Sequence, residues 1–187
     1  MYLEHAPMSN DTARPDEPTI ATLTDPETLR DHATVAYETE TKHVPGDDFG
    51  ELREDLAPVD GWVVVGLTND DDALLLMDDG EHGWTLPAVS VRDGDWADRA
   101  GEVVAGLTGR TTDFTTVERV RRIDYHEEAD DGHVTVHHVV VRAEPVTGEP
   151  TAGEPTVGCD GTAEVDWVDA LPDELEGFVR DDAELFR

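Results

Sequence analysis

The sequence is poor in positive charge. Its 187 residues include 13 Lys and Arg against 45 Asp and Glu, which gives a formal net charge of −32 at pH 7, and Lys42 is the only lysine. Scattered arginines do not assemble the basic patch that binding to a phosphate backbone needs, so we expect no nucleic acid partner. Self-repulsion at this charge opposes compaction in dilute buffer, whereas molar salt shortens the Debye length to about 3 Å and screens it. The composition is therefore what we expect of a halophilic protein.

Cysteine and long apolar runs are also scarce. The single cysteine, Cys159, excludes an internal disulfide and a multi-cysteine zinc site. No apolar run approaches the roughly 18 residues that a membrane-spanning helix needs. The N-terminus has neither the basic region nor the apolar region of a signal peptide. We therefore expect a cytoplasmic protein with no membrane partner.

The chain divides into a leader and one domain. Residues 1–22 are polar and rich in Pro, Asp and Thr, which predicts a flexible acidic leader. Residues 23–187 have the length of one domain with a core of ordinary size. Within it, the apolar runs 62–68 and 73–77 flank an acidic turn and predict a hairpin of two strands.

The remaining pattern is rich in strands. Residues 114–126 and 133–145 predict a long hairpin around the acidic turn "EEADDG", and "AEVDWVDAL" predicts a last strand. One helix is expected over 95–107 and another at the C-terminus, with Leu175, Phe178, Val179 and Leu185 as its apolar residues. The predicted class is therefore α/β with a central mixed sheet.

The helix over 95–107 has two different faces. At about 100° per residue, one stripe collects the apolar residues Trp96, Ala100, Val103, Val104 and Leu107. The nearly opposite face carries Asp95, Asp98 and Glu102, spaced i, i+3, i+7. A row of carboxylates suits Mg²⁺, which takes a few oxygen ligands and keeps several waters.

The order of these segments resembles the Nudix family of hydrolases, over about residues 60–171. The apolar strand pair leads to Trp84-Thr85-Leu86-Pro87, Gly94-Asp95 opens the helix, and Thr108-Gly109 closes it. "AEVDWVDALPDEL" is similar to the closing strand of the family.

The resemblance implies a Nudix-type α/β/α sandwich. It also implies hydrolysis of a nucleoside diphosphate linked to another moiety, with Mg²⁺ or Mn²⁺ bound by the carboxylates of the helix. The expected partner is a small nucleotide-like substrate.

The signature box of the family is nevertheless degenerate here. The box runs Gly, five residues, Glu, seven residues, then Arg-Glu-apolar-x-Glu-Glu-x-Gly. Ala88-Val89 stand where Gly-Gly is expected after the proline, and Asp95 replaces the first Glu. Counting forward from Asp95 or back from Gly109 does not recover the Glu-Glu pair, and the helix is one residue short.

A reduced acidic site is what remains of the box. Asp95, Asp98 and Glu102 are the candidate metal ligands, and Glu102 is also a candidate catalytic residue. Glu128, in the loop between the two long strands, is a candidate general base, because a later loop supplies one in some members of the family. The alternatives are an N-cap role for Asp95 and solvated carboxylates for the other three.

Two histidines on one strand bear on the choice of metal site. His137 and His138 are adjacent, so on a strand they point to opposite faces and do not bind one metal together.

The sequence leaves two functions open. One is the metal-dependent diphosphate hydrolase, and the other is a catalytically inactive Nudix-fold module that binds a nucleotide or a protein partner. The sequence does not indicate the oligomeric state.

Overall fold

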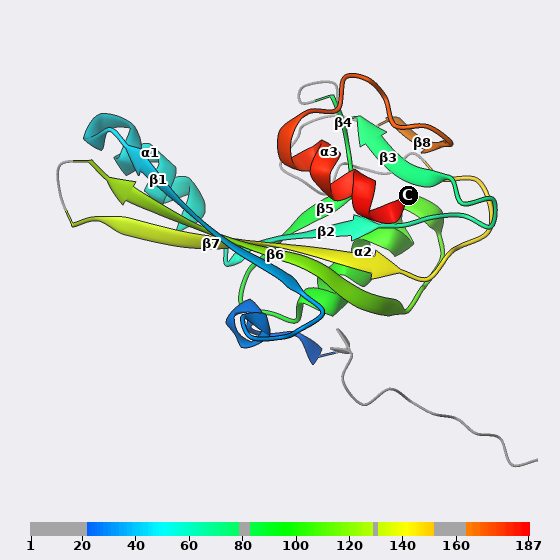
Figure 1. Cartoon of the computed structure of the whole chain (residues 1–187), viewed down its shortest axis with the longest axis horizontal. Coiled ribbons are helices and arrows are strands. Elements are labelled where there is room, and N and C mark those ends of the chain that lie inside the picture. Colours follow the sequence, from blue (N-terminus) through cyan, green and yellow to red (C-terminus); the bar gives the residue numbers. More distant parts are fainter. Residues whose placement is uncertain (1–21, 79–82, 129–130, 152–163) are drawn as a thin grey trace, which may run out of the picture.

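The computed structural model describes residues 22–78, 83–128, 131–151 and 164–187 (Figure 1). A five-stranded sheet has the order β1-β6-β7-β2-β5, and a three-stranded sheet has the order β4-β3-β8. Cys159 and all but the last residue of the predicted leader lie outside the described residues.

The five-stranded sheet is the central, mixed sheet. Its strands are β1 (Ala36–Val44), β6 (Phe114–Glu127), β7 (His133–Ala143), β2 (Gly61–Gly66) and β5 (Ala88–Val91). The long strands β6 and β7 pair antiparallel, β1 pairs parallel with β6, and β2 pairs parallel with β7. The strand β5 closes the other edge, antiparallel to β2. The mixed sheet predicted from the sequence is confirmed.

The two apolar runs predicted as a hairpin belong to different sheets. The turn between them forms as expected: Asn69 Oδ1 accepts from the backbone N–H of Asp71 at 3.0 Å and of Ala73 at 2.9 Å. Beyond one bridge between Thr68 and Leu74, however, the strands diverge. The strand β2 has β7 and β5 as its neighbours, while β3 (Leu74–Asp78) pairs with β4 (Trp84–Thr85) and β8 (Glu164–Val168). The prediction of a paired hairpin is therefore wrong beyond the turn.

The helix α2 (Trp96–Thr108) matches the prediction closely. Asp95 is its N-cap, and Gly109 ends it with a φ of 65°, the left-handed conformation that glycine adopts without strain. Its buried residues are the predicted apolar stripe together with Ala97. An amphipathic helix with capping residues at both ends is readable from local sequence alone.

Helices flank the central sheet on both faces. Val63 and Val65 of β2 pack with the stripe of α2 on one face. On the other face Val140 packs with α3 (Gly177–Ala183), with the 3₁₀ turn Glu184–Phe186 and with the three-stranded sheet. The molecule is thus an α/β sandwich around a mixed sheet, the class that the sequence predicts.

The outer halves of β6 and β7 project from this body as an arm (Figure 1). They carry β1 along one edge and α1 (Gly46–Leu56) on one face, and Figure 1 shows α1 and α3 above the same side of the sheet. A small core of Leu56, Ile123 and Val136 holds the arm together.

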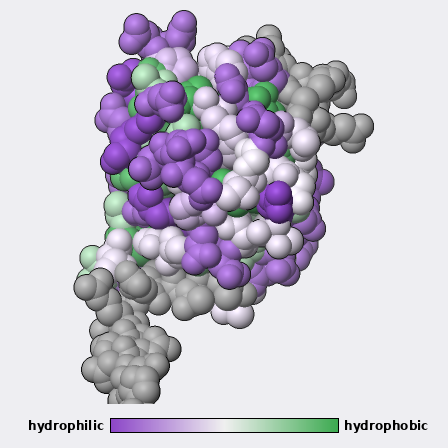
Figure 2. Space-filling view, turned by 90° about the vertical axis from the view of Figure 1, so that its right-hand side faces the viewer, coloured by the Kyte–Doolittle hydropathy of each residue, from purple (hydrophilic) through white to green (hydrophobic). Residues whose placement is uncertain are grey.

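Hydrophilic side chains predominate on the face of the molecule that Figure 2 displays. Phe178 is the one large hydrophobic residue with a high exposure, 40%, in the described part of the chain. No helix within the described ranges has the length and apolar character needed to cross a membrane.

Candidate functional site

The three predicted metal ligands lie at the N-terminus and on the exposed side of α2. Asp95 caps the helix: its Oδ1 accepts from the backbone N–H of Ala97 at 2.8 Å and of Asp98 at 3.4 Å. The N-cap interpretation of Asp95 is therefore confirmed. The side chain of Glu102 is 62% exposed and forms an ion pair with Arg99 one turn before it.

These residues do not fit a divalent ion in the arrangement that the structure shows. Among the described residues, no three His, Cys, Asp or Glu side chains are grouped so that they could hold a metal ion. One oxygen of Asp95 already accepts from the helix N-terminus, and Glu102 is paired with a cation. Mg²⁺ requires ligand oxygens at about 2.0–2.1 Å in near-octahedral geometry, so separate carboxylates do not suffice.

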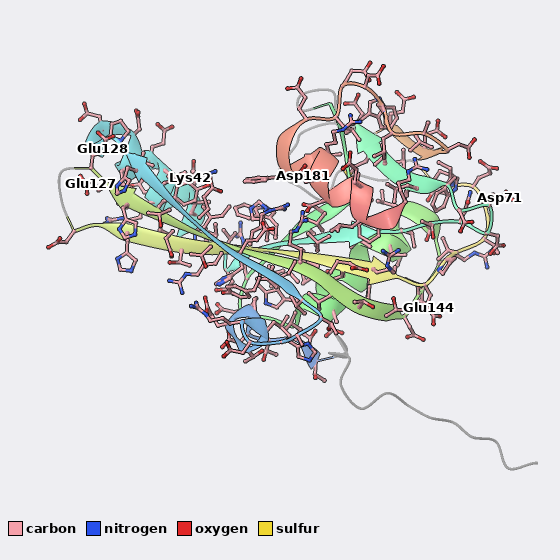
Figure 3. The ribbon with its side chains drawn as sticks, in the orientation of Figure 1. Lys42, Asp71, Glu127, Glu128, Glu144 and Asp181 are labelled. Carbon is pink, nitrogen blue, oxygen red and sulfur yellow. The ribbon has the colours of Figure 1, made fainter. Side chains whose placement is uncertain are left out.

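Glu128, the candidate general base, lies far from α2. It follows the end of β6 at the tip of the arm, where Figure 3 labels it beside Glu127. Its side chain is exposed, and its backbone N–H donates to the carbonyl of Val44 at 3.0 Å. The helix α2 lies in the body of the molecule, away from the arm (Figure 1). The structure does not bring Glu128 and Glu102 together.

A cavity of about 470 Å³ lies on the opposite face of the central sheet from α2, beneath α3. We call it the ring pocket, because four of its side chains carry rings: Trp62, Tyr125, His138 and Phe178. The other lining residues are Val64, Thr85, Leu86, Ala88, Val179 and Asp182. A mostly apolar pocket of several hundred cubic ångströms with few polar groups is typical of small-molecule sites.

Strand alternation and register build the pocket floor. Trp62 and Val64 lie on one face of β2, and the parallel register sets Trp62 beside His138 of β7. Their rings are 5.1 Å apart between centroids and tilted by 58°. Thr85 and Leu86, at and after β4, and Phe178 and Val179, on α3, complete the walls.

An ion-pair network at the wall of the pocket fixes α3 to the sheet. Asp182, which is 4% exposed, accepts from Arg119 Nη1 at 2.8 Å and from Arg121 Nη1 at 2.6 Å. Arg121 also donates to Glu38 at 3.1 Å, and its guanidinium lies over the Phe178 ring, 4.5 Å from the centroid. These charges are paired with one another, so the wall keeps a defined shape.

His138 is the polar group on the pocket floor. Burial, and next the charge of Arg121, lower the pKa of His138 from 6.5 to about 4. The imidazole is therefore neutral at pH 7 and offers one hydrogen-bond donor and one acceptor.

His137 points to the other face of β7, as predicted. Its Nε2 lies 2.9 Å from Glu27 Oε1 in the 3₁₀ turn Pro26–Leu29. Burial raises the pKa of Glu27, but hydrogen bonds with His137 and Arg30 and the charge of Arg122 outweigh it and lower the pKa to about 2. This network attaches the N-terminal turn to the sheet and is separate from the ring pocket.

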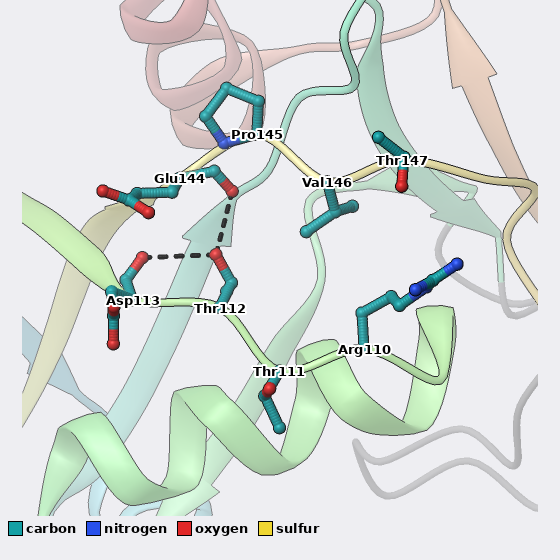
Figure 4. Close-up of a pocket in the computed structure, with 8 residues that line it drawn as sticks. All are labelled: Arg110, Thr111, Thr112, Asp113, Glu144, Pro145, Val146 and Thr147. Atoms are coloured by element: carbon teal, nitrogen blue, oxygen red, sulfur yellow. Dashed lines mark hydrogen bonds between the residues drawn. The ribbon is translucent and has the colours of Figure 1, made fainter.

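A second hollow of about 350 Å³ lies between residues 110–113 and 144–147 (Figure 4). Most of its lining side chains are exposed, with Val146 as the buried one. The Thr112 hydroxyl lies 2.9 Å from the carbonyl oxygen of Glu144, which ties the two segments together. The hollow has no aromatic wall, so it is less suited to a small molecule than the ring pocket.

The ring pocket is not predicted by the sequence. Its residues come from β2, β5, β6, β7 and α3 and from the segment at β4, and only the register of the sheet aligns them. The usable signal was alternation: Trp62 and Val64, like His138 and Val140, stand two apart on strands and share a face. Which strand lies beside which is not encoded in that local signal.

Comparisons with known proteins give little further guidance. No protein-family model matches the chain, and no curated protein matches it. A solved structure of a MutT protein from Methanosarcina mazei Go1 matches 79% of this chain and 94% of its own, at 17% identity and a TM-score of 0.46. A putative oxidoreductase from Sinorhizobium meliloti 1021 matches 58% of this chain and 34% of its own, at 23% identity and a TM-score of 0.29. At such TM-scores, neither likeness establishes what the chain does.

Proposed function

We propose that the chain is a binding module for a small molecule with a planar heteroaromatic ring, such as the base of a nucleotide, and that the ring pocket holds this ring. The observation that carries the proposal is the set of four ring side chains around a cavity of about 470 Å³. Stacking of a base on an aromatic side chain contributes about 1–3 kcal/mol, so the pocket offers substantial binding energy without any metal.

The polar groups of the pocket fit the edge of such a ring. The neutral imidazole of His138 supplies a donor and an acceptor at the floor, and Thr85, which carries a hydroxyl, lines the wall. A heteroaromatic ring carries ring nitrogens and exocyclic groups that pair with them. A purely aliphatic ligand would leave these polar groups unpaired, which disfavours it.

The metal-dependent diphosphate hydrolase is the second candidate. It is supported by the resemblance to the Nudix family at Trp84–Pro87, Gly94-Asp95 and Thr108-Gly109, and by the exposed carboxylates of Asp98 and Glu102 on α2. Under this proposal Mg²⁺ or Mn²⁺ would bind at Asp95, Asp98 and Glu102. The described residues hold no group of three such side chains that could bind a metal ion, and Asp95 caps α2, which favours the binding module instead.

Calorimetric titration with neutral heteroaromatic compounds, beginning with adenosine and nicotinamide, tests the binding module. We expect Trp62→Leu to weaken binding about tenfold, because it removes one stacking surface from the pocket. Trp167→Leu is the matched control, because Trp167 does not line the pocket and its indole N–H donates to the carbonyl of Gly148. Equal affinity of both variants and the wild type, or no binding of any ring compound, would refute the proposal.

An activity screen over nucleoside diphosphate compounds with Mg²⁺ or Mn²⁺ in molar KCl tests the hydrolase. We expect no metal-dependent turnover from the wild type. Turnover that Glu102→Gln abolishes would instead establish the hydrolase, since Glu102 faces solvent and the substitution leaves the core intact.

A further inference from the structure

We propose that Lys42 makes the ring pocket selective for ligands whose heteroaromatic ring carries one anionic group, a carboxylate or a phosphate monoester. The inference rests on the proposed binding of a ring in that pocket. It adds the position and the charge of a second recognition point, beside two of the rings that line the pocket.

Lys42 lies beside two of the rings that line the pocket. Its Nζ lies over the Tyr125 ring, 5.7 Å from the centroid, and over the Phe178 ring, 5.5 Å from the centroid. Lys42 is on β1, in register with Tyr125 of β6, while Phe178 comes from α3. Figure 3 labels Lys42 on the arm and Asp181 on α3. A ligand ring held at Trp62 and His138 can thus direct an anionic substituent toward the ammonium group over Tyr125 and Phe178.

The ion pair of Lys42 is also longer than those of the other cations near the pocket. Arg119 and Arg121 donate to the buried carboxylate of Asp182 at hydrogen-bond distance. The ion pair of Lys42 with Glu40 is 3.6 Å long, beyond hydrogen-bond distance, and its side chain is 37% exposed. An ammonium group has three donors, so Lys42 can bind a ligand anion while it stays near Glu40.

The surroundings limit how much negative charge the ligand can carry. On β1 the neighbours of Lys42 on the same face are Glu40 and Glu38, with side chains 41% and 50% exposed. The described residues hold no cluster that would recruit a divalent ion to neutralise a second phosphate. A diphosphate would therefore face carboxylates without a further counter-charge, whereas one anionic group pairs with Lys42.

Paired titrations test this selectivity. Adenosine is compared with AMP and ADP, and nicotinamide with nicotinate, in EDTA and at the lowest KCl concentration that leaves the circular dichroism spectrum unchanged. We expect AMP to bind about three- to tenfold more tightly than adenosine, and ADP to bind no more tightly than AMP. The nicotinate pair shows whether a carboxylate is accepted as well as a phosphate.

Three variants assign the effect to Lys42. Lys42→Met keeps an apolar side chain of similar length and should remove the preference for the anionic partner of each pair, while Lys42→Arg should keep it. Arg110→Met removes an exposed charge outside the ring pocket and should leave the preference unchanged. Equal binding of neutral and anionic compounds, or a preference that survives in Lys42→Met, would overturn the inference while the neutral compounds still bind. Failure of the neutral compounds themselves would refute the proposed function instead.

Discussion

At the scale of single residues, the type of a side chain was a weaker guide than its position. Asp95 was correctly predicted as a possible N-cap, because a carboxylate just before an apolar helical stripe can accept hydrogen bonds from the first backbone N–H groups of the helix. His137 and His138 were correctly separated, because alternation along a strand is a local rule. The candidate metal ligands remain a prediction, and their arrangement on α2 does not favour it. An acidic residue in a chain with 45 Asp and Glu carries little information by itself. Phe178 and Asp182 acquire their roles only through contacts with distant strands.

Gly61 shows how a long-range contact constrains one residue. It begins β2 with a φ of +153°, and a Cβ atom at this position would lie 1.8 Å from the carbonyl oxygen of His137. We expect Gly61→Ala to lower the free energy of unfolding by about 2–3 kcal/mol, because the neighbouring backbone must shift. Urea denaturation measures the change.

Gly101→Ala is the control for that measurement. Gly101 lies inside α2, and a Cβ atom there would meet nothing within 4 Å. Alanine should therefore stabilise the helix by roughly 0.5–1 kcal/mol. A Gly61→Ala variant as stable as the wild type would show that β2 and β7 are not packed as closely as the structure has them.

At the scale of elements, local patterns predicted the helices better than the pairing of the strands. The apolar stripe and both ends of α2 follow from periodicity and capping, which are short-range properties. The strands β2 and β3 are also where the sequence suggested. Their separation into two sheets depends on distant partners: β2 pairs with β7, as Gly61 does with His137, and β3 pairs with β8, as Leu74 does with Val168. The ring pocket lies between those sheets and α3, so it was missed for the same reason.

The buried ion pairs of Asp182 should decide whether α3 stays on the sheet. Asp182→Ala would leave Arg121, whose side chain is 4% exposed, without its carboxylate partner on α3. Removing one partner of a buried pair typically costs 3–5 kcal/mol, and the remaining contact with Glu38 reduces this, so we expect a loss of about 2–4 kcal/mol. Urea denaturation gives the loss, and faster hydrogen exchange at residues 177–183 locates it.

The neighbouring carboxylate provides the matched control. Asp181 is exposed on the same helix, and Asp181→Ala should change the stability by no more than about 0.5 kcal/mol. Similar losses for both variants would mean that net charge, rather than the buried pairs, holds α3 in place.

At the scale of the whole molecule, the acidic composition does not determine the fold. The α/β class follows from strands and helices of ordinary length, and nothing in the arrangement of the sheets requires a net charge of −32. The charge acts instead on the stability of any compact state, through repulsion between carboxylates. It also makes individual carboxylates poor indicators of a site.

The last prediction follows from that repulsion. We expect the chain to lose its compact state as KCl is lowered from molar to millimolar concentration, because the Debye length grows from about 3 Å toward 30 Å and carboxylates across the surface then repel one another. Thermal melts followed by circular dichroism in a KCl series measure the effect. Screening should place most of the gain in melting temperature below about 0.5 M, where the Debye length changes most steeply. A gain that continues steadily through the molar range would indicate salting-out of apolar surface instead, and a melting temperature that does not change with KCl would contradict the prediction.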